Sequence, residues 1–293
     1  MSSSKKVILT GASGLIGKET LLPLKDAGFD IYALTIDVNN PQVDGVKWLP
    51  CNIFNIEELQ RVFKETQPQY LLNLAWATTG DYLKSNTNFD FLNAGINMLK
   101  FFKENGGKRA VFAGTCFEYE FKNTLLKETD KINPQTVYAK CKNYLREIAE
   151  LYCANNTVSF GWGRIFYVYG KNEHPSRLTA HVINSLRENK EVIVKSSSLI
   201  KDYVYSKDVA GAFVKLLDSS VEGSVNICMG SPISIKDYVL KIATALKKEN
   251  LIKFENNDNS QPPYIVGDNS RLIKEVKYWF NYDFDRALKE VIT

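Results

Sequence analysis

The sequence predicts an α/β fold, in which a doubly wound parallel sheet is followed by a smaller mixed C-terminal domain. Strand-like and helix-like segments alternate over the first 170 of the 293 residues, which is typical of a parallel sheet covered by helices on both faces. A glycine-rich turn, Gly11 to Gly17, lies between the first strand and the first helix. With 44% hydrophobic residues, a chain of this length buries a large core without disulfides.

The individual elements follow from hydrophobic spacing. Short apolar runs predict strands, and apolar residues three or four positions apart predict helices. Gly28 is the expected C-cap of the first helix, and Pro23 interrupts that helix and is expected to kink it. The expected strands are Lys6–Thr10, Asp30–Thr35, Val46–Leu49, Tyr70–Ala75, Arg109–Ala113 and Val158–Phe166, and the expected helices are Leu15–Ala27, Ile56–Glu65, Asn88–Glu104 and Tyr138–Cys153.

The glycine-rich turn predicts a site for the diphosphate of a dinucleotide. It follows a strand directly and opens a helix. Gly11 and Gly14 allow a tight turn and a close approach of backbone to the diphosphate, while Gly17 lets the helix pack against the strand. The N–H groups at the start of the helix attract the anion. We therefore expect a Rossmann domain whose cofactor contacts include Gly11, Ser13, Gly14, Leu15, Ile16 and Gly17.

The chain is expected to divide near Gly170. Residues 1–170 form the dinucleotide-binding domain in this interpretation. Residues 171–293 form mostly a smaller substrate-binding domain, because the segments shorten and the regular alternation ends there. The stretch 206–230 reads as a helix and a strand and is expected to return to the sheet. Ligands of such sheets bind at the carboxyl ends of the strands.

Composition excludes several classes of function. The net charge of +4 is mild, and no basic stripe carries interleaved aromatics, which argues against nucleic acid as a partner. Five scattered cysteines without a CxxC pair predict neither a disulfide framework nor a zinc site. Two histidines leave little material for a metal site. The sequence has no apolar run long enough for a membrane span and no signal-peptide pattern at its start, so a cytoplasmic location is expected.

The choice between NAD and NADP stays open from the sequence. An acid at the end of the second strand binds the ribose hydroxyls of NAD, whereas an arginine favours NADP. Asp37 favours NAD, although Thr35 stands where the acid is expected, and no lysine or arginine lies between Asp26 and Gly45. The alternative interpretation makes Asp37 a solvated loop residue.

Tyr138 and Lys142 are the candidates for proton transfer. They stand four positions apart on an expected helix and therefore share a face. We expect the ammonium group to lower the pKa of the phenol, so that Tyr138 exchanges a proton with an alcohol oxygen while hydride moves to or from a nicotinamide. Thr115, after the fifth strand, is a candidate to hydrogen-bond the reacting oxygen, with a turn-capping role as the alternative.

These motifs together resemble the extended short-chain dehydrogenases/reductases, and more narrowly the nucleotide-sugar epimerases, dehydratases and 4-keto reductases. The resemblance extends over nearly the whole chain. The segment 164–170 (RIFYVYG) is similar to the family's R-x-F-x-x-Y-G, 201–208 to its R-D-F-x-x-V-x-D, and 226–230 to its N-x-G-x-G. The resemblance implies the catalytic roles for Thr115, Tyr138 and Lys142.

The resemblance also implies further cofactor contacts. Asn73-Leu74-Ala75-Trp76 stands where the family has H-L-A-A, so Leu74, Ala75 and Trp76 are expected to line the cofactor. Trp76 is also a candidate to shape the sugar pocket, with core filling as the alternative. Asn52, Ile53, Asp37, Tyr138 and Lys142 complete the expected cofactor-binding set.

Departures from the family pattern narrow the reaction. In the family's 4,6-dehydratases the catalytic threonine is followed by Asp-Glu, and here those positions are Cys116 and Phe117. Phenylalanine cannot transfer protons, which argues against a dehydratase. Cys116 is a candidate base and substrate contact, provided that its pKa is lowered.

Four more residues are candidates for substrate binding. Lys201 replaces the family's phosphate-binding arginine and is expected to contact a diphosphate, although it loses the bidentate geometry. His181 lies in a segment resembling that of the GDP-fucose-forming members, which makes it a candidate acid or sugar ligand. Arg177 and Arg271 are candidates for nucleotide or sugar contacts. For each residue the alternative is a structural or solvated side chain.

The predicted function is a reductase that delivers hydride from NAD or NADP to the 4-keto group of a nucleotide-linked 6-deoxyhexose. Tyr138 protonates the new alkoxide, and Lys142 tunes Tyr138 and holds the nicotinamide ribose. A nucleotide-sugar 4-epimerase is the alternative, because it needs the same proton relay. A non-catalytic dinucleotide-binding regulator is disfavoured by the complete constellation. Apolar stripes in 88–104 and 138–153, paired across a two-fold axis in the family, imply a homodimer.

Overall fold

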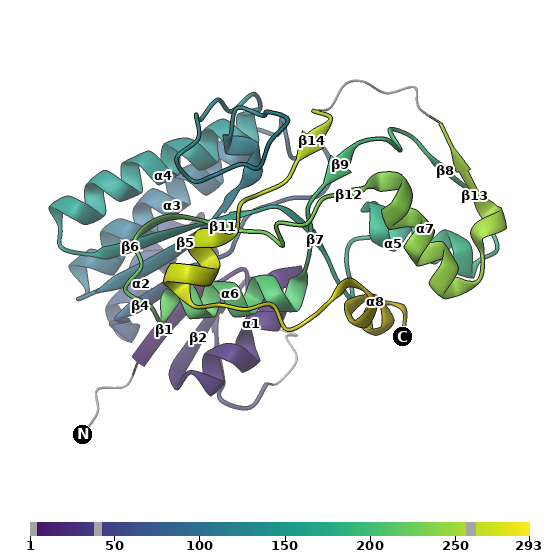
Figure 1. Ribbon diagram of the computed structural model, residues 1–293. Coiled ribbons are helices and arrows are strands. Elements are labelled where there is room, and N and C mark those ends of the chain that lie inside the picture. Colours follow the sequence, from purple (N-terminus) through teal and green to yellow (C-terminus); the bar gives the residue numbers. More distant parts are fainter. Residues whose placement is uncertain (1–4, 38–42, 256–261) are drawn as a thin grey trace.

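The computed structural model describes residues 5–37, 43–255 and 262–293 and is dominated by a seven-stranded parallel sheet (Figure 1). The strand order is β11-β6-β5-β4-β1-β2-β3, and every neighbouring pair in it is parallel. This is the doubly wound order, with a switch point between β1 and β4. The strands are β1 (Lys5–Thr10), β2 (Phe29–Thr35), β3 (Val46–Pro50), β4 (Tyr70–Asn73), β5 (Arg109–Thr115), β6 (Ser159–Ile165) and β11 (Gly223–Ile227).

Helices cover both faces of the sheet and build a separate core on each. On one face α1 (Leu15–Asp26) packs against α6 (Ser206–Leu217). On the other face lie α2 (Ile56–Thr66), α3 (Thr87–Glu104) and α4 (Val137–Asn155) (Figure 1). The predicted fold class is therefore confirmed.

The C-terminal part forms a smaller lobe with its own core. Helices α5 (Leu178–Arg187), α7 (Ile235–Leu246) and α8 (Phe284–Ile292) pack together there with β8 (Val192–Val194) and β13 (Ile252–Phe254). Five short strands connect the lobes, namely β7 (Tyr167–Tyr169), β9 (Ile200–Lys201), β10 (Tyr203–Tyr205), β12 (Ile233–Ser234) and β14 (Tyr264–Ile265). The short helical turns are η1 (Cys116–Glu118), η2 (Glu249–Leu251) and η3 (Leu272–Val276).

The C-terminal chain returns to the first lobe twice. As expected, α6 and β11 belong to the large sheet and its helical layer. Beyond the expected return, Leu272, Val276 and Tyr278 also pack into the core beneath α1 and α6. This segment therefore belongs to the core of the large sheet, although it lies between α7 and α8 in the chain.

Two element boundaries differ from expectation for local reasons. Strand β4 ends at Asn73 rather than Ala75, because the Thr10 hydroxyl donates to the Asn73 side chain and accepts from the Ala75 N–H, replacing the backbone ladder. Helix α1 continues through Pro23 to Asp26. Gly28 follows it at φ +77°, the left-handed conformation expected where a helix ends.

Candidate active site

The glycine turn between β1 and α1 has no room for side chains at two of its positions. A Cβ on Gly11, which has φ +71°, would lie 2.8 Å from the Ala75 backbone nitrogen. A Cβ on Gly17 would lie 2.0 Å from the Gly11 carbonyl oxygen. The turn therefore presses against the start of α1 on one side and the end of β4 on the other. Only glycine permits this close approach of backbone at the switch point of the sheet.

The first turn of α1 is left open to an anion. Gly14 is its N-cap, no side chain caps the helix, and no acid lies in its first turn. The early N–H groups of a helix lack intrahelical partners and carry the positive end of the helix dipole. Backbone from Ser13, Leu15 and Ile16 lies at this end, so the turn fits the diphosphate of a dinucleotide.

The other expected cofactor residues lie at the carboxyl ends of neighbouring strands. Asp37 is exposed after β2, and its backbone N–H and carbonyl both bond the Thr35 hydroxyl. Asn52 is exposed after β3, and Ile53 packs beside the α2 and α3 core. Leu74 is half-buried after β4 and packs against the α1 core. They line the sheet edge at which ligands of this fold bind.

The structure brings Thr115, Tyr138 and Lys142 together. Thr115 is the last residue of β5, and Tyr138 and Lys142 lie on α4, whose N-cap Thr136 accepts from the Ala139 N–H. The Thr115 hydroxyl lies close enough to the Tyr138 phenol to favour its ionised form. The Lys142 ammonium donates to the Ala113 carbonyl at 2.6 Å. All three side chains are at most 6% exposed, so they form one buried polar cluster at the carboxyl end of β5.

The expected low pKa of Tyr138 is wrong. Burial raises the pKa of the phenol well above its usual value, and the nearby Thr115 hydroxyl offsets only part of that. The ring lies edge-on to Tyr82 at 5.1 Å and to Trp76 at 6.2 Å between centroids. In this apolar setting the neutral phenol is favoured. Tyr138 therefore holds its proton at neutral pH, as a proton donor must.

Burial shifts the pKa of Lys142 downward, whereas it raises that of Tyr138. Burial lowers the pKa of the lysine ammonium group to about 7, and the charge of Glu118 raises it only in part. The Nζ atom lies 3.9 Å from the centroid of the Trp76 ring. No carboxylate within ion-pair distance of Lys142 is found among the described residues. The lysine is thus a buried cation held by a carbonyl and an aromatic face.

Glu118 is a site residue that the sequence reasoning missed. It is fully buried and accepts from the Thr115 N–H at 2.9 Å, the Trp162 indole at 3.0 Å and Arg164 Nε at 2.7 Å. It completes a capping box with Thr115 over η1. The Thr-x-x-Glu spacing was the sequence signal available for it. Through these bonds the carboxylate fixes the backbone that carries the Thr115 hydroxyl.

The substrate side of the cluster is built from both lobes. Lys201 is 1% exposed, donates to the Pro262 carbonyl at 3.0 Å and lies 5.4 Å from the Tyr167 ring. Burial lowers the pKa of Lys201 to about 8, and Cys116 lies close enough to offset that in part. Among the residues that the structure describes, the buried Tyr167 hydroxyl has no hydrogen-bond partner. A polar atom without a partner at this position is available to a ligand.

Cys116 does not have the lowered pKa that a base would need. Its thiol is buried, and burial raises its pKa to about 12. The neutral thiol is therefore the stable form at physiological pH. Phe117 packs its ring 6.2 Å from Tyr167 and 6.0 Å from Phe121. The two positions after Thr115 contribute apolar surface and no acid or base.

Arg177 lies near the cluster, whereas His181 faces outward. Arg177 caps α5, donates to the Thr78 carbonyl of the first lobe, and lies 5.4 Å from the Tyr82 ring that contacts Tyr138. His181 is exposed on the same helix, and Val182 and Ile183 beside it face the small-lobe core.

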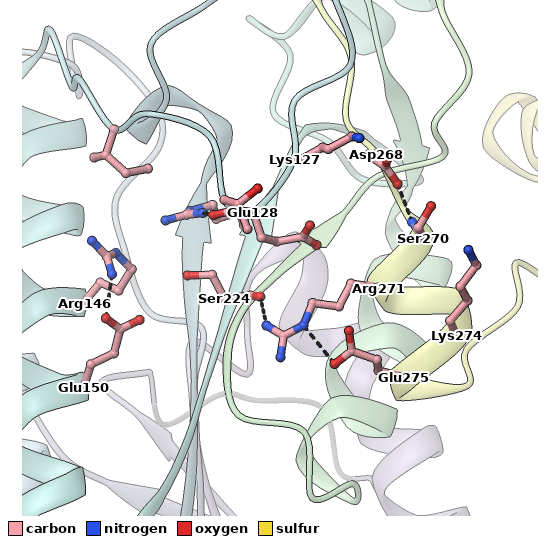
Figure 2. Close-up of a pocket in the computed structure, with 13 residues that line it drawn as sticks. Lys127, Glu128, Arg146, Glu150, Ser224, Asp268, Ser270, Arg271, Lys274 and Glu275 are labelled. Atoms are coloured by element: carbon pink, nitrogen blue, oxygen red, sulfur yellow. Dashed lines mark hydrogen bonds and ion pairs between the residues drawn. The ribbon is translucent and has the colours of Figure 1, made fainter.

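Arg271 is placed away from the cluster. Its guanidinium donates to the Ser224 and Glu222 carbonyls and pairs with Glu275 at 3.0 Å. Ser224 lies at the amino end of β11, whereas Thr115 lies at the carboxyl end of β5. Arg271 lines a cavity of about 700 Å³ together with the charged side chains Arg146, Glu150 and Lys127 (Figure 2). Its bonds to backbone carbonyls fasten η3 to β11, so the expected substrate contact is not supported.

Comparison with known proteins identifies the family. Residues 7–228 match the NAD dependent epimerase/dehydratase family. The chain belongs to this family. The match spans the glycine turn, the Thr115–Tyr138–Lys142 cluster and β11, which is the whole large sheet. The family is NAD dependent, so of the two coenzymes that the sequence left open the comparison supports NAD.

Two curated relatives cover most of the chain. The chain is 25% identical to the CDP-abequose synthase of Salmonella typhimurium over 98% of this chain and 97% of that protein. It is 23% identical to the dTDP-6-deoxy-L-talose 4-dehydrogenase (NAD(+)) of Aggregatibacter actinomycetemcomitans over 80% of this chain and 87% of that protein.

Solved structures agree on the fold. The UDP-glucose 4-epimerase of Thermus thermophilus in complex with NAD superposes with a TM-score of 0.87 at 20% identity, covering 98% of this chain and 97% of that one. The UDP-N-acetylglucosamine 4-epimerase of Methanobrevibacter ruminantium gives 0.89 at 19% identity, covering 99% and 97%. None of the described helices is long and apolar enough to cross a membrane.

Proposed function

We propose that the protein reduces the 4-keto group of a nucleotide-linked 6-deoxyhexose. The observation that carries the proposal is the burial of Thr115, Tyr138 and Lys142 in one cluster, with the Lys142 ammonium fixed on the Ala113 carbonyl. Two hydroxyls that converge at the carboxyl end of β5 are suited to bind one carbonyl oxygen. They lie at the same carboxyl edge of the sheet as the glycine turn, which supports a position for that oxygen at the nicotinamide end of a bound dinucleotide.

Each residue has a defined part in this reduction. The reduced nicotinamide, when bound, supplies the hydride. Thr115 donates a hydrogen bond to the substrate carbonyl and orients it. Tyr138 passes its phenolic proton to the oxygen as negative charge develops there, which turns the ketone into an alcohol. The Lys142 ammonium stabilises the phenolate left behind and would hold the nicotinamide ribose of the bound cofactor.

The surroundings favour reduction over dehydration. Removal of water from a sugar needs a second acid–base pair, and the residues after Thr115 are a neutral buried thiol and a phenylalanine. Reduction needs one proton only, and Tyr138 carries it. The name of one relative, a 4-dehydrogenase, supports this choice, since oxidation of a C4 hydroxyl is the reverse of 4-keto reduction.

The test is turnover of reduced nicotinamide with nucleotide-linked 4-keto-6-deoxyhexoses that carry CDP, dTDP or GDP. We expect one of them to oxidise NADH with stoichiometric formation of the 4-hydroxy sugar. Interconversion of two 4-hydroxy sugars without added cofactor, together with NAD released on denaturation, would instead establish a 4-epimerase. Cofactor binding with neither reaction would leave a regulator.

We further propose a homodimer built on α3 and α4. Tyr144, Ile148 and Leu151 lie one turn apart on α4 and are 50%, 43% and 67% exposed, and Phe89 on α3 is 51% exposed. These exposed side chains leave an apolar face that a second copy would cover. Light scattering after gel filtration tests the assembly, with Leu151→Glu expected to shift a dimer to a monomer.

A further inference from the structure

Two contacts hold Trp76 in place. Its ring stacks on Phe91 with centroids 5.2 Å apart and planes 20° from parallel. Its indole N–H donates to the Asn88 side chain at 2.8 Å. Asn88 is 1% exposed and is itself fixed, because its amide donates to the Tyr82 and Ser85 carbonyls. The ring therefore has a set position and orientation beside the carboxyl end of β4.

The free face of this ring meets Lys142. Nζ lies 3.9 Å from the ring centroid, well inside the range in which a cation is attracted to an aromatic face, and tryptophan provides the strongest such face. The edge of the Tyr138 ring also meets Trp76. One indole thus contacts both members of the proton relay and approaches them from outside α4.

The groups around Lys142 leave most of its buried charge uncompensated, apart from the contact with the Trp76 ring. From η1, Glu118 is the acid whose charge acts on the ammonium, and it is already bound by Arg164, Trp162 and Thr115. From β5, the Ala113 carbonyl accepts its hydrogen bond. From α4 itself, Tyr138 is neutral. No other described group compensates the buried charge directly.

We propose that Trp76 is a positioning residue for Lys142. The indole face of Trp76 keeps the lysine side chain charged and directed at Tyr138, the other member of the proton relay. The proposal rests on the proposed function only in giving Lys142 its catalytic part. It implies that loss of the ring makes Lys142 shed its proton at lower pH, because the attraction favours the charged form alone.

The experiment is a titration of Lys142 in the full-length protein by NMR of ¹³C-labelled lysine, with the resonance assigned by its absence in Lys142→Arg. We expect a wild-type midpoint near pH 7. Trp76→Leu should lower the midpoint by about one pH unit, and Trp76→Phe, which keeps an aromatic face, by less than half as much. Trp48→Leu, a matched change on β3, should leave it unchanged. Equal midpoints in wild type and Trp76→Leu would overturn the proposal, and so would equal drops in the Leu and Phe variants.

Fluorinated tryptophan covers the case in which Trp76→Leu does not fold. Successive fluorine atoms weaken the electrostatic attraction of the face with little change in shape, so the midpoint should fall stepwise with their number. A flat series would overturn the proposal. The titration needs no substrate, so its failure is separate from a failure of the proposed reaction. If turnover is observed, the alkaline limb of its pH profile should shift with the midpoint in Trp76→Leu and recover in Trp76→Phe.

Discussion

Arg164 and Lys142 are two buried cations near Thr115, and their surroundings shift their pKa values in opposite directions. Arg164 on β6 is 2% exposed and bonds Glu118 Oε2 at 2.7 Å and the Tyr119 hydroxyl at 3.0 Å. Burial alone would lower the pKa of Arg164, but the charge and hydrogen bonds of Glu118 and Tyr119 more than offset it and raise the pKa. Lys142 is 4% exposed, no carboxylate in the described part of the chain forms an ion pair with it, and its pKa falls to about 7.

The difference separates Arg164, whose charge has a structural role, from Lys142, for which we propose a catalytic role. A cation with its own carboxylate stays charged at every physiological pH and fixes its surroundings, which here means Glu118 and the Thr115 backbone. A buried cation that has no carboxylate partner is costly to keep charged. Its pKa is therefore shifted toward neutral pH, so a bound ligand can change its protonation state. The Glu118–Arg164 pair thus fixes the backbone beside the proposed proton relay, while the lysine of that relay, Lys142, has a pKa near neutral pH.

The largest effect should come from breaking the paired cation. Arg164→Met leaves the fully buried Glu118 without its main partner, and we expect the free energy of unfolding to fall by about 3–5 kcal/mol. Urea denaturation at neutral pH measures it. A loss below about 1 kcal/mol would show that the pair contributes no more than an exposed one.

The opposite sign is expected for the unpaired cation. Lys142→Met removes a charge that is costly to bury, so at pH 6 we expect a gain of about 1–3 kcal/mol in the free energy of unfolding together with loss of turnover. Because the lysine has a lower pKa in the folded state than its usual 10.5, wild-type stability rises with pH above about 7 and the gain should shrink at pH 9. A destabilised variant at pH 6 would contradict the contrast between the two cations.

The same cation should set the alkaline limb of activity. Tyr138 needs the charged form of Lys142 beside it, so kcat/KM should fall as pH rises through about 7. Lys142→Arg keeps the charge at all these pH values. Its profile should be flat over the same range, at lower absolute activity. Parallel profiles for the two proteins would assign the limb to another group.

The smallest effect is expected at Arg271, a partly exposed cation bonded to backbone carbonyls outside the cluster. Arg271→Ala should change kcat/KM by less than about 2-fold and cost about 1–2 kcal/mol of stability. Arg177→Ala, at the edge of the cluster, should instead raise KM. Steady-state kinetics of the two variants side by side tests the placement of both arginines.

Sequence reasoning succeeded where the chemistry is local in the chain. The glycine turn and the Tyr138–Lys142 spacing each lie within one turn or helix, so their geometry follows from element type alone. The pKa direction of Tyr138, the Glu118–Arg164 pair and the contact of Trp76 with Lys142 depend on packing between distant segments. Arg271 shows the same limit, since only the return of η3 to β11 places it outside the cluster.

The central claim is that Tyr138 is the proton donor in reduction of a nucleotide-linked 4-keto sugar. The most direct measurement compares kcat/KM of Tyr138→Phe with that of Tyr144→Phe, the exposed tyrosine on the same helix, using NADH and the best 4-keto-6-deoxyhexose. Loss of general acid catalysis predicts a decrease of about 10²–10⁴-fold for Tyr138→Phe, unchanged NADH affinity, and wild-type turnover for Tyr144→Phe. Turnover of Tyr138→Phe within a few-fold of wild type would contradict the account.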